Sequence, residues 1–181
     1  MTPSSDFKRY GLVAQAFHWA IAILLLGLFL SNAMREITPR ESELRMLWLN
    51  LHMSLGFLVF GLTLARIAWR RLVPPPALLD APAWSRLAAN LGHLLLNLAT
   101  LLVPISGYLR IASKDIPADF FGTQIPSILG EMPGLHAFVK AWPHGEPMEL
   151  FFYALIGVHV LAALWHQYIR RDNGLHRMLP W

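Results

Sequence analysis

Cysteine is absent from the 181 residues of this chain. Without a thiol, the protein forms neither disulfide bonds nor the thiolate-ligated zinc and iron–sulfur sites. Charged residues are also scarce, at 14% of the sequence against 55% hydrophobic residues. The net charge of +4 does not indicate nucleic-acid binding, because the basic residues lie at the ends of apolar segments and not in one patch. The composition therefore favours a membrane protein.

Four apolar segments are each long enough to cross about 30 Å of hydrocarbon as a helix. Their interiors contain no Asp or Glu. We expect an all-α membrane protein, a bundle of four transmembrane helices that forms a single domain over residues 1–181. The expected spans are residues 11–33, 47–69, 87–109 and 147–169.

The segments between the spans differ in composition. The proline-rich connector over residues 74–82 cannot be helical and should be extended. Residues 110–149 form a long segment rich in Pro and Gly, which we expect to be a loop. Pro104 should kink the third span near its far end.

Lysine and arginine counts predict the orientation of the spans. The N-terminus, the second connector and the C-terminus carry Lys8, Arg9, Arg66, Arg70, Arg71, Arg86, Arg170, Arg171 and Arg177. The other two loops carry fewer basic residues, and acidic residues dilute them. The positive-inside rule therefore places both termini in the cytoplasm.

The histidines fall at two depths when distances are counted along the helices. His18 lies about 15 Å inside the cytoplasmic end marked by Lys8, and His159 lies about 16 Å from Arg170. His52 lies about 27 Å from Arg70, near the outer surface. His144 is the histidine beside the fourth span at that outer level. We expect two pairs, His18 with His159 on the inner side and His52 with His144 on the outer side.

Paired imidazoles at two levels of a helix bundle favour haem over zinc. Zinc sites use three or four tight ligands, often with carboxylates, whereas a low-spin haem needs two axial imidazoles and an apolar slot. Arg66 and Arg70 are candidate partners of the haem propionates. Glycines near the histidines would let a flat macrocycle approach the backbone: Gly56, Gly61 and Gly157. The alternative for any single histidine is a hydrogen bond between helices.

Several motifs occur in an order that resembles the bacterial cytochrome b561 family over nearly the whole chain. They include His18-Trp19, residues 51–56 (LHMSLG), residues 91–93 (LGH), residues 104–108 (PISGY) and residues 157–159 (GVH). The tail at residues 171–180 (RDNGLHRMLP) is also similar. The resemblance implies a four-helix cytochrome of the bacterial inner membrane with two b haems that exchanges electrons with the quinone pool.

The family's ligands map onto His18, His52, His144 and His159, the same set that depth counting indicates. The competing candidate for the fourth ligand is His136, eight residues before His144. Two further histidines are predicted near the inner surface. His93 and His166 lie about 10 Å and 6 Å from the nearest flanking arginines, so they are candidates for a quinone or proton site, or are solvated interfacial residues.

We therefore expect a membrane di-haem b cytochrome that passes electrons from a periplasmic donor to ubiquinone. In one branch of the family the resemblance implies superoxide as that donor, oxidised to dioxygen. The expected partners are membrane lipids, the quinone pool and the periplasmic donor. No nucleic-acid partner is expected. Two alternatives stay open: a haem-b electron-transfer subunit that anchors a dehydrogenase or hydrogenase, and a histidine-based metal transporter. A transporter would require carboxylates or thiols within the membrane, which the interiors of the spans lack.

Overall fold

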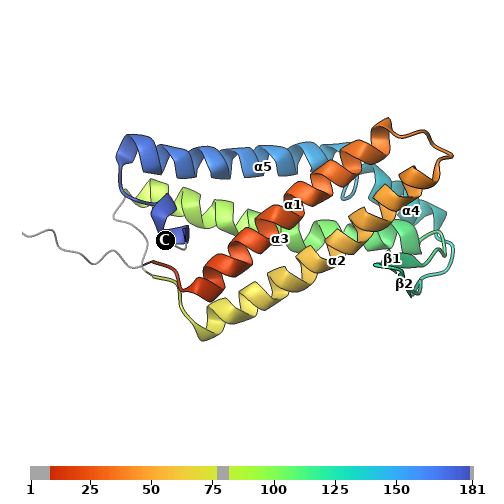
Figure 1. Ribbon diagram of the computed structural model, residues 1–181, viewed down its shortest axis with the longest axis horizontal. Coiled ribbons are helices and arrows are strands. Elements are labelled where there is room, and N and C mark those ends of the chain that lie inside the picture. The colour runs from red at the N-terminus through yellow and green to blue at the C-terminus, as the bar shows by residue number, and fades with distance from the viewer. Residues whose placement is uncertain (1–8, 77–81, 180–181) are drawn as a thin grey trace, which may run out of the picture.

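The computed structural model describes residues 9–76 and 82–179 (Figure 1). Most of the proline-rich connector falls between these two ranges, and residues 74–76 are non-helical. The elements in chain order are α1 (Leu12–Ile37), α2 (Glu43–Leu72), α3 (Ala83–Ala112), β1 (Ala118–Phe120), β2 (Thr123–Ile125), α4 (Pro133–Ala141), α5 (Glu146–Trp165), the π-helix η1 (His166–Arg170) and the 3₁₀-helix η2 (Leu175–Met178).

The four long helices confirm the predicted bundle, since each is long and apolar enough to cross a membrane. α2 and α3 are longer than the expected spans by several residues at each end. Ser42 caps the start of α2, where its hydroxyl accepts a hydrogen bond from the Arg45 backbone N–H at 3.2 Å. Pro104 lies inside α3, which continues through it as one helix.

The packing of the bundle is that of a membrane protein. Side chains facing outward are large and apolar, such as Leu26 and Leu161, which are 68% and 67% exposed. Several side chains between the helices are small and polar, including Ser31, Ser54, Thr63 and Ser106. Small residues let helix backbones approach closely, and hydroxyls form hydrogen bonds to backbone carbonyls where water is absent. The bundle therefore has the architecture of a multi-pass membrane protein.

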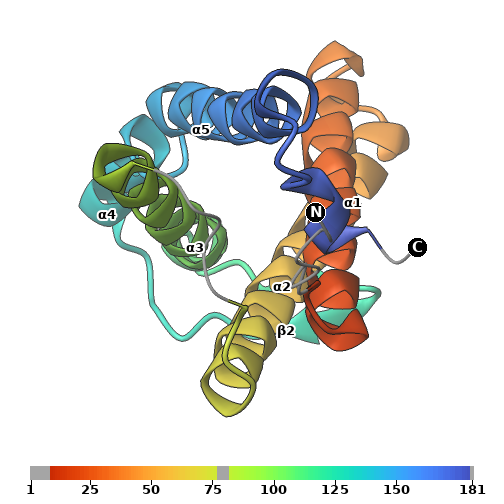
Figure 2. The ribbon, with the colours of Figure 1, turned by 90° about the vertical axis from the view of Figure 1, so that its left-hand side faces the viewer.

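Both described ends of the chain lie at the same end of the bundle, as Figure 2 shows. The Tyr10 backbone N–H donates to the Arg177 carbonyl at 3.1 Å, and the Trp19 indole N–H donates to the Met178 carbonyl at 2.8 Å. The tail therefore folds back against the start of α1. The positive-inside rule predicts that this shared end is the cytoplasmic one.

The segment expected to be a loop, residues 110–149, is more ordered than predicted. Its first residues belong to α3, and it contains the antiparallel hairpin β1–β2 and the short helix α4. Ser54 of α2 holds the hairpin, because its hydroxyl accepts from the Phe121 N–H at 2.9 Å. The buried Asp119 carboxylate accepts from the Gly122 N–H and the Gln124 amide. These contacts form a folded cap over the outer end of the bundle.

Candidate functional site: two histidine clusters in the bundle

The structure brings His52 of α2 and His144 together at the outer end of the bundle. His144 lies in the turn between α4 and α5, and its ring centre is 6.2 Å from that of His52. An imidazole nitrogen binds a transition-metal ion at about 2 Å and the ring centre lies about 1 Å further out, so two rings on opposite sides of one ion have centres about 6 Å apart. This separation suits a single bis-imidazole iron.

Both outer rings are oriented by hydrogen bonds of the same kind. His52 Nδ1 lies 3.1 Å from the Leu28 carbonyl and 3.1 Å from Ser31 Oγ. His144 Nδ1 lies 3.1 Å from the Val103 carbonyl. It is also 3.3 Å from Ser106 Oγ. A carbonyl oxygen only accepts, so Nδ1 carries the proton in each ring and the Nε2 lone pair is left for a ligand.

Two glycines allow His144 to reach this position. A Cβ on Gly107 of α3 would lie 2.8 Å from His144 Cε1, so only glycine leaves room for the ring. A Cβ on Gly145 would lie 2.2 Å from the Lys140 carbonyl oxygen, where two backbone segments meet. The close approach of the chain, and not a left-handed conformation, therefore requires glycine in this turn.

Three histidines from three helices meet at the inner level. The ring of His159 of α5 lies 6.2 Å from that of His18 of α1, centre to centre. On α3, His93 also contacts His159, with ring centres 5.7 Å apart. His159 is therefore shared between two neighbours, and the His18–His159 separation equals that of the outer pair.

The sequence placed His93 near the inner surface, about 10 Å from Arg86 along the helix. In the structure it lies level with His159, since their ring centres are 5.7 Å apart. Because α3 begins at Ala83, ten residues precede His93, and it lies about 15 Å along the helix axis. A flanking arginine inside the helix is thus a poor marker of the helix end.

Arginines lie near both clusters. At the inner level Arg66 interacts electrostatically with His18 and His159. Its neighbour Arg70 interacts with His93, and neither arginine has an acidic partner within the described residues. At the outer level Arg35 and Arg110 interact electrostatically with His52 and His144. Sequence reasoning did not assign these two outer arginines to the haem site, because they come from separate loops.

His166 lies apart from the three inner histidines, at the start of the π-helix that follows α5. Its Nδ1 is 2.5 Å from the Asp172 carboxylate, which also accepts from the Gly174 N–H and lies 3.5 Å from Arg170 Nε. Arg171 adopts a left-handed conformation with φ 54°, which turns the chain back so that Asp172 reaches His166. The acid of this pair was missed in the sequence, where only its position six residues on from a histidine could have indicated it.

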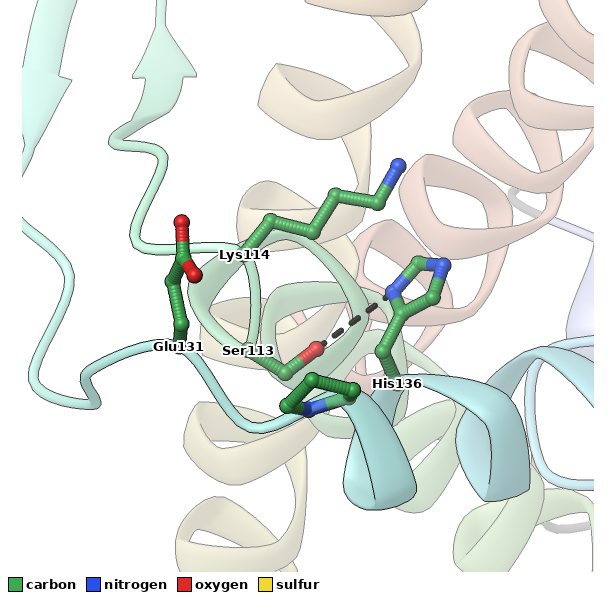
Figure 3. Close-up of a pocket in the computed structure, with 5 residues that line it drawn as sticks. Ser113, Lys114, Glu131 and His136 are labelled. Atoms are coloured by element: carbon green, nitrogen blue, oxygen red, sulfur yellow. Dashed lines mark hydrogen bonds between the residues drawn. The ribbon is translucent and has the colours of Figure 1, made fainter.

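His136 lies away from the outer pair, in a pocket of the outer cap (Figure 3). The pocket has a volume of about 370 Å³ and is lined by Ser113, Lys114, Glu131, Pro133 and His136. His136 Nδ1 donates to the Arg110 carbonyl at 3.0 Å, and the Arg110 guanidinium donates to the His144 carbonyl at 2.9 Å. The competing fourth ligand is therefore two hydrogen bonds away from His144 and does not face His52.

Within residues 9–76 and 82–179, no group of three or more His, Asp or Glu side chains is arranged to hold a metal ion. A haem iron differs from such a site because the macrocycle supplies four of its ligands. Two histidines at each level are then enough. The arrangement fits haem and does not favour a transported metal ion.

Comparison with known proteins agrees with this reading. The family model described as prokaryotic cytochrome b561 matches residues 9–181. The chain is 33% identical over 181 residues to cytochrome b561 homolog 2 of Escherichia coli K12, covering 95% of this chain and 92% of that protein. It is 28% identical to cytochrome b561 homolog 1 of the same organism, covering 96% and 98%. A probable superoxide oxidase, CybB of Yersinia pestis, is 27% identical and covers 96% and 97%. The chain belongs to the prokaryotic cytochrome b561 family, the membrane b-type cytochromes that carry electrons.

Proposed function

We propose that this cytochrome holds two b haems, one between His52 and His144 and one between His18 and His159. The observation that carries the proposal is the equal ring separation of 6.2 Å in both pairs, at opposite ends of the bundle. When bound, each haem supplies a one-electron couple, and the protein tunes that couple through its axial ligands and their hydrogen bonds.

Open space beside two glycines supports this placement. A Cβ added to Gly56, one turn from His52, or to Gly157, two residues from His159, would meet nothing within 4 Å. Both levels thus leave open space beside a glycine.

Arginines near each pair are the proposed partners of the haem propionates. Arg66 and Arg70 would serve the inner haem, where they neutralise carboxylates that lie near the membrane interface. The structure offers Arg35 and Arg110 for the outer haem. Arg110 is already aligned, since it donates to the His144 carbonyl at 2.9 Å.

Superoxide is the electron donor that we propose at the outer face. One of the relatives carries the description probable superoxide oxidase. Lys114 and Lys140 of the outer cap are not assigned to a propionate, and their positive charges would attract a small anion. Each superoxide gives up one electron and leaves as dioxygen, so two superoxide ions supply the two electrons that reduce one quinone.

Ubiquinone is the proposed acceptor, bound near the inner surface beside His166, with His93 as a second candidate contact deeper in the bundle. Reduction of a quinone to a quinol takes two electrons and two protons. The Asp172 carboxylate fixes the Nδ1 proton of His166, which leaves Nε2 available to exchange a proton with a ligand. His166 is half-buried, which allows contact with both the membrane and water.

The proposal is tested on the purified protein by three measurements. Haem extraction should give two b haems per chain, and a redox titration should give two one-electron steps. A superoxide-generating system should then reduce ubiquinone, and superoxide dismutase should abolish that reduction. One haem per chain would overturn the ligand pairs, whereas two haems without superoxide-dependent reduction would overturn the donor only.

A further inference from the structure

The inner histidines differ from the outer ones in the hydrogen bonds of the ring nitrogen that would face away from the iron. Both outer rings bond a backbone carbonyl and a serine hydroxyl through Nδ1. Among the described residues, His18, His93 and His159 have no such bond to backbone or carboxylate. An axial histidine nearly always donates its other N–H to a partner, which orients the ring and raises its basicity. The inner ligands therefore need a partner that is not a carbonyl.

His93 is the polar side chain in contact with His159 that the ligand pair does not use. Its ring centre is 5.7 Å from that of His159, and the rings are inclined by 67°. Two imidazoles joined by an N–H···N hydrogen bond of about 2.9 Å have ring centres about 5 Å apart. A small rotation of either side chain closes this distance.

We infer that His93 is the hydrogen-bond acceptor of His159. This inference rests on the proposed ligation of the inner iron by His18 and His159. His93 is thus a positioning residue that acts on the inner haem through the ligand, in addition to any contact with quinone. A neutral imidazole has one acceptor nitrogen, which suits the Nδ1–H of an iron-bound histidine. The three rings are half-buried between the helices, where a lower dielectric makes this bond stronger than it would be in water.

The direction of the effect follows from charge. A ligand that donates its second proton to an acceptor carries more negative charge on the iron-bound nitrogen, and this stabilises the ferric state. Removing the acceptor should therefore favour the ferrous state of the inner haem. Loss of a ligand's hydrogen-bond partner commonly changes metal-site properties by tenfold or more.

The experiment compares His93→Phe with His93→Gln in purified protein freed of quinone. Phe retains ring volume without an acceptor, whereas the Gln carbonyl restores one. His93→Phe should keep two low-spin haems and raise the ferrous-to-ferric ratio of the inner haem about tenfold at fixed poise, or about 59 mV for one electron. The outer haem should not change, and His93→Gln should recover most of the shift. His136→Phe, in the outer cap, is the matched control and should shift neither haem.

Three results would overturn the inference. If both haems keep their potentials in His93→Phe, then His159 has no functional partner in His93. If Gln fails to recover the shift, the effect is one of packing. If His93→Phe loses the low-spin signal of the inner haem, His93 is itself a ligand. The ligand pair is tested separately, because His159→Ala must remove the inner haem whatever His93 does.

Discussion

The outer and inner histidine pairs have the same ring separation, but different surroundings hold them. At the outer level, each ring is held by a backbone carbonyl and by a serine hydroxyl three residues later on a neighbouring helix. Leu28 and Ser31 hold His52, and Val103 and Ser106 hold His144. At the inner level, contacts among the three imidazoles replace those bonds. The backbone thus orients the outer site before any cofactor binds, whereas ring packing orients the inner site.

The difference matches the positions of the proposed ligands in the fold. His18 and His159 both lie within long transmembrane helices, so the regular backbone already places them. His144 lies in a turn, where the backbone does not fix the side chain without further contacts. A ligand from a turn therefore requires its own hydrogen bonds and the space that Gly107 provides.

Removing one ligand at each level should separate the two sites most strongly. His52→Ala should lose the outer haem and keep the inner one, and His18→Ala should do the reverse, because the pairs do not share a ligand. Haem content should fall from two to about one per chain. Redox titration of each variant identifies which step is lost, and His136→Ala should retain both. Loss of the same step in the two variants would refute the pairing.

Gly145→Ala should disrupt the outer site alone. The added Cβ would lie 2.2 Å from the Lys140 carbonyl oxygen, so the turn must move and carry His144 with it. We expect a destabilisation of about 1–3 kcal/mol and little outer haem, with the inner haem retained. Gly134→Ala in α4 is the control, since its Cβ would meet nothing within 4 Å. Normal outer haem in the Gly145 variant would show that the turn adapts to a side chain.

Ser106→Ala should weaken the outer site without abolishing it. The Ser106 hydroxyl donates to the Pro143 carbonyl at 2.8 Å and lies 3.3 Å from His144 Nδ1, so it ties α3 to the turn. Its loss should cost about 1 kcal/mol and lower outer haem affinity about tenfold. Haem titration of the apoprotein measures this. The inner haem has no serine partner, so its affinity should not change; an equal loss at both levels would contradict the contrast.

The four-helix bundle and the approach of His18 to His159 could be predicted from the sequence because both depend on regular helices. Four apolar runs predict four helices, and a rise of about 1.5 Å per residue places His18 and His159 at one depth. The same counting did not indicate that His93 meets His159, because it was measured from Arg86 and not from the start of α3. It also described the outer cap as a loop, since the hairpin depends on contacts with the distant Ser54.

Contacts between residues far apart in the sequence could not be predicted. Gly107 makes room for His144 from another helix, and a single sequence contains no signal for that contact. Asp172 meets His166 only because the chain leaves the π-helix through the left-handed Arg171. Such conformations depend on the packing of the tail against the bundle, which local preferences do not determine.

Asp172→Asn should have the smallest effect of these substitutions. It should change the rate of quinone reduction and not the haem sites. The Asn carbonyl still accepts from His166 Nδ1–H, but the bond loses its negative charge and the 3.5 Å contact with Arg170 is weakened. A charge-assisted hydrogen bond is roughly twice as strong as a neutral one, so the loss is about 1 kcal/mol, or about fivefold in the rate of quinone reduction. Stopped-flow oxidation of the reduced protein by a soluble quinone measures that rate, and both haem potentials should match those of the unmodified protein.

The control for a general loosening of the tail is His176→Asn, because the His176 imidazole bonds Gln167 on the same π-helix. If it slows quinone reduction as much as Asp172→Asn does, the effect belongs to the fold of the tail and not to the proton held on His166.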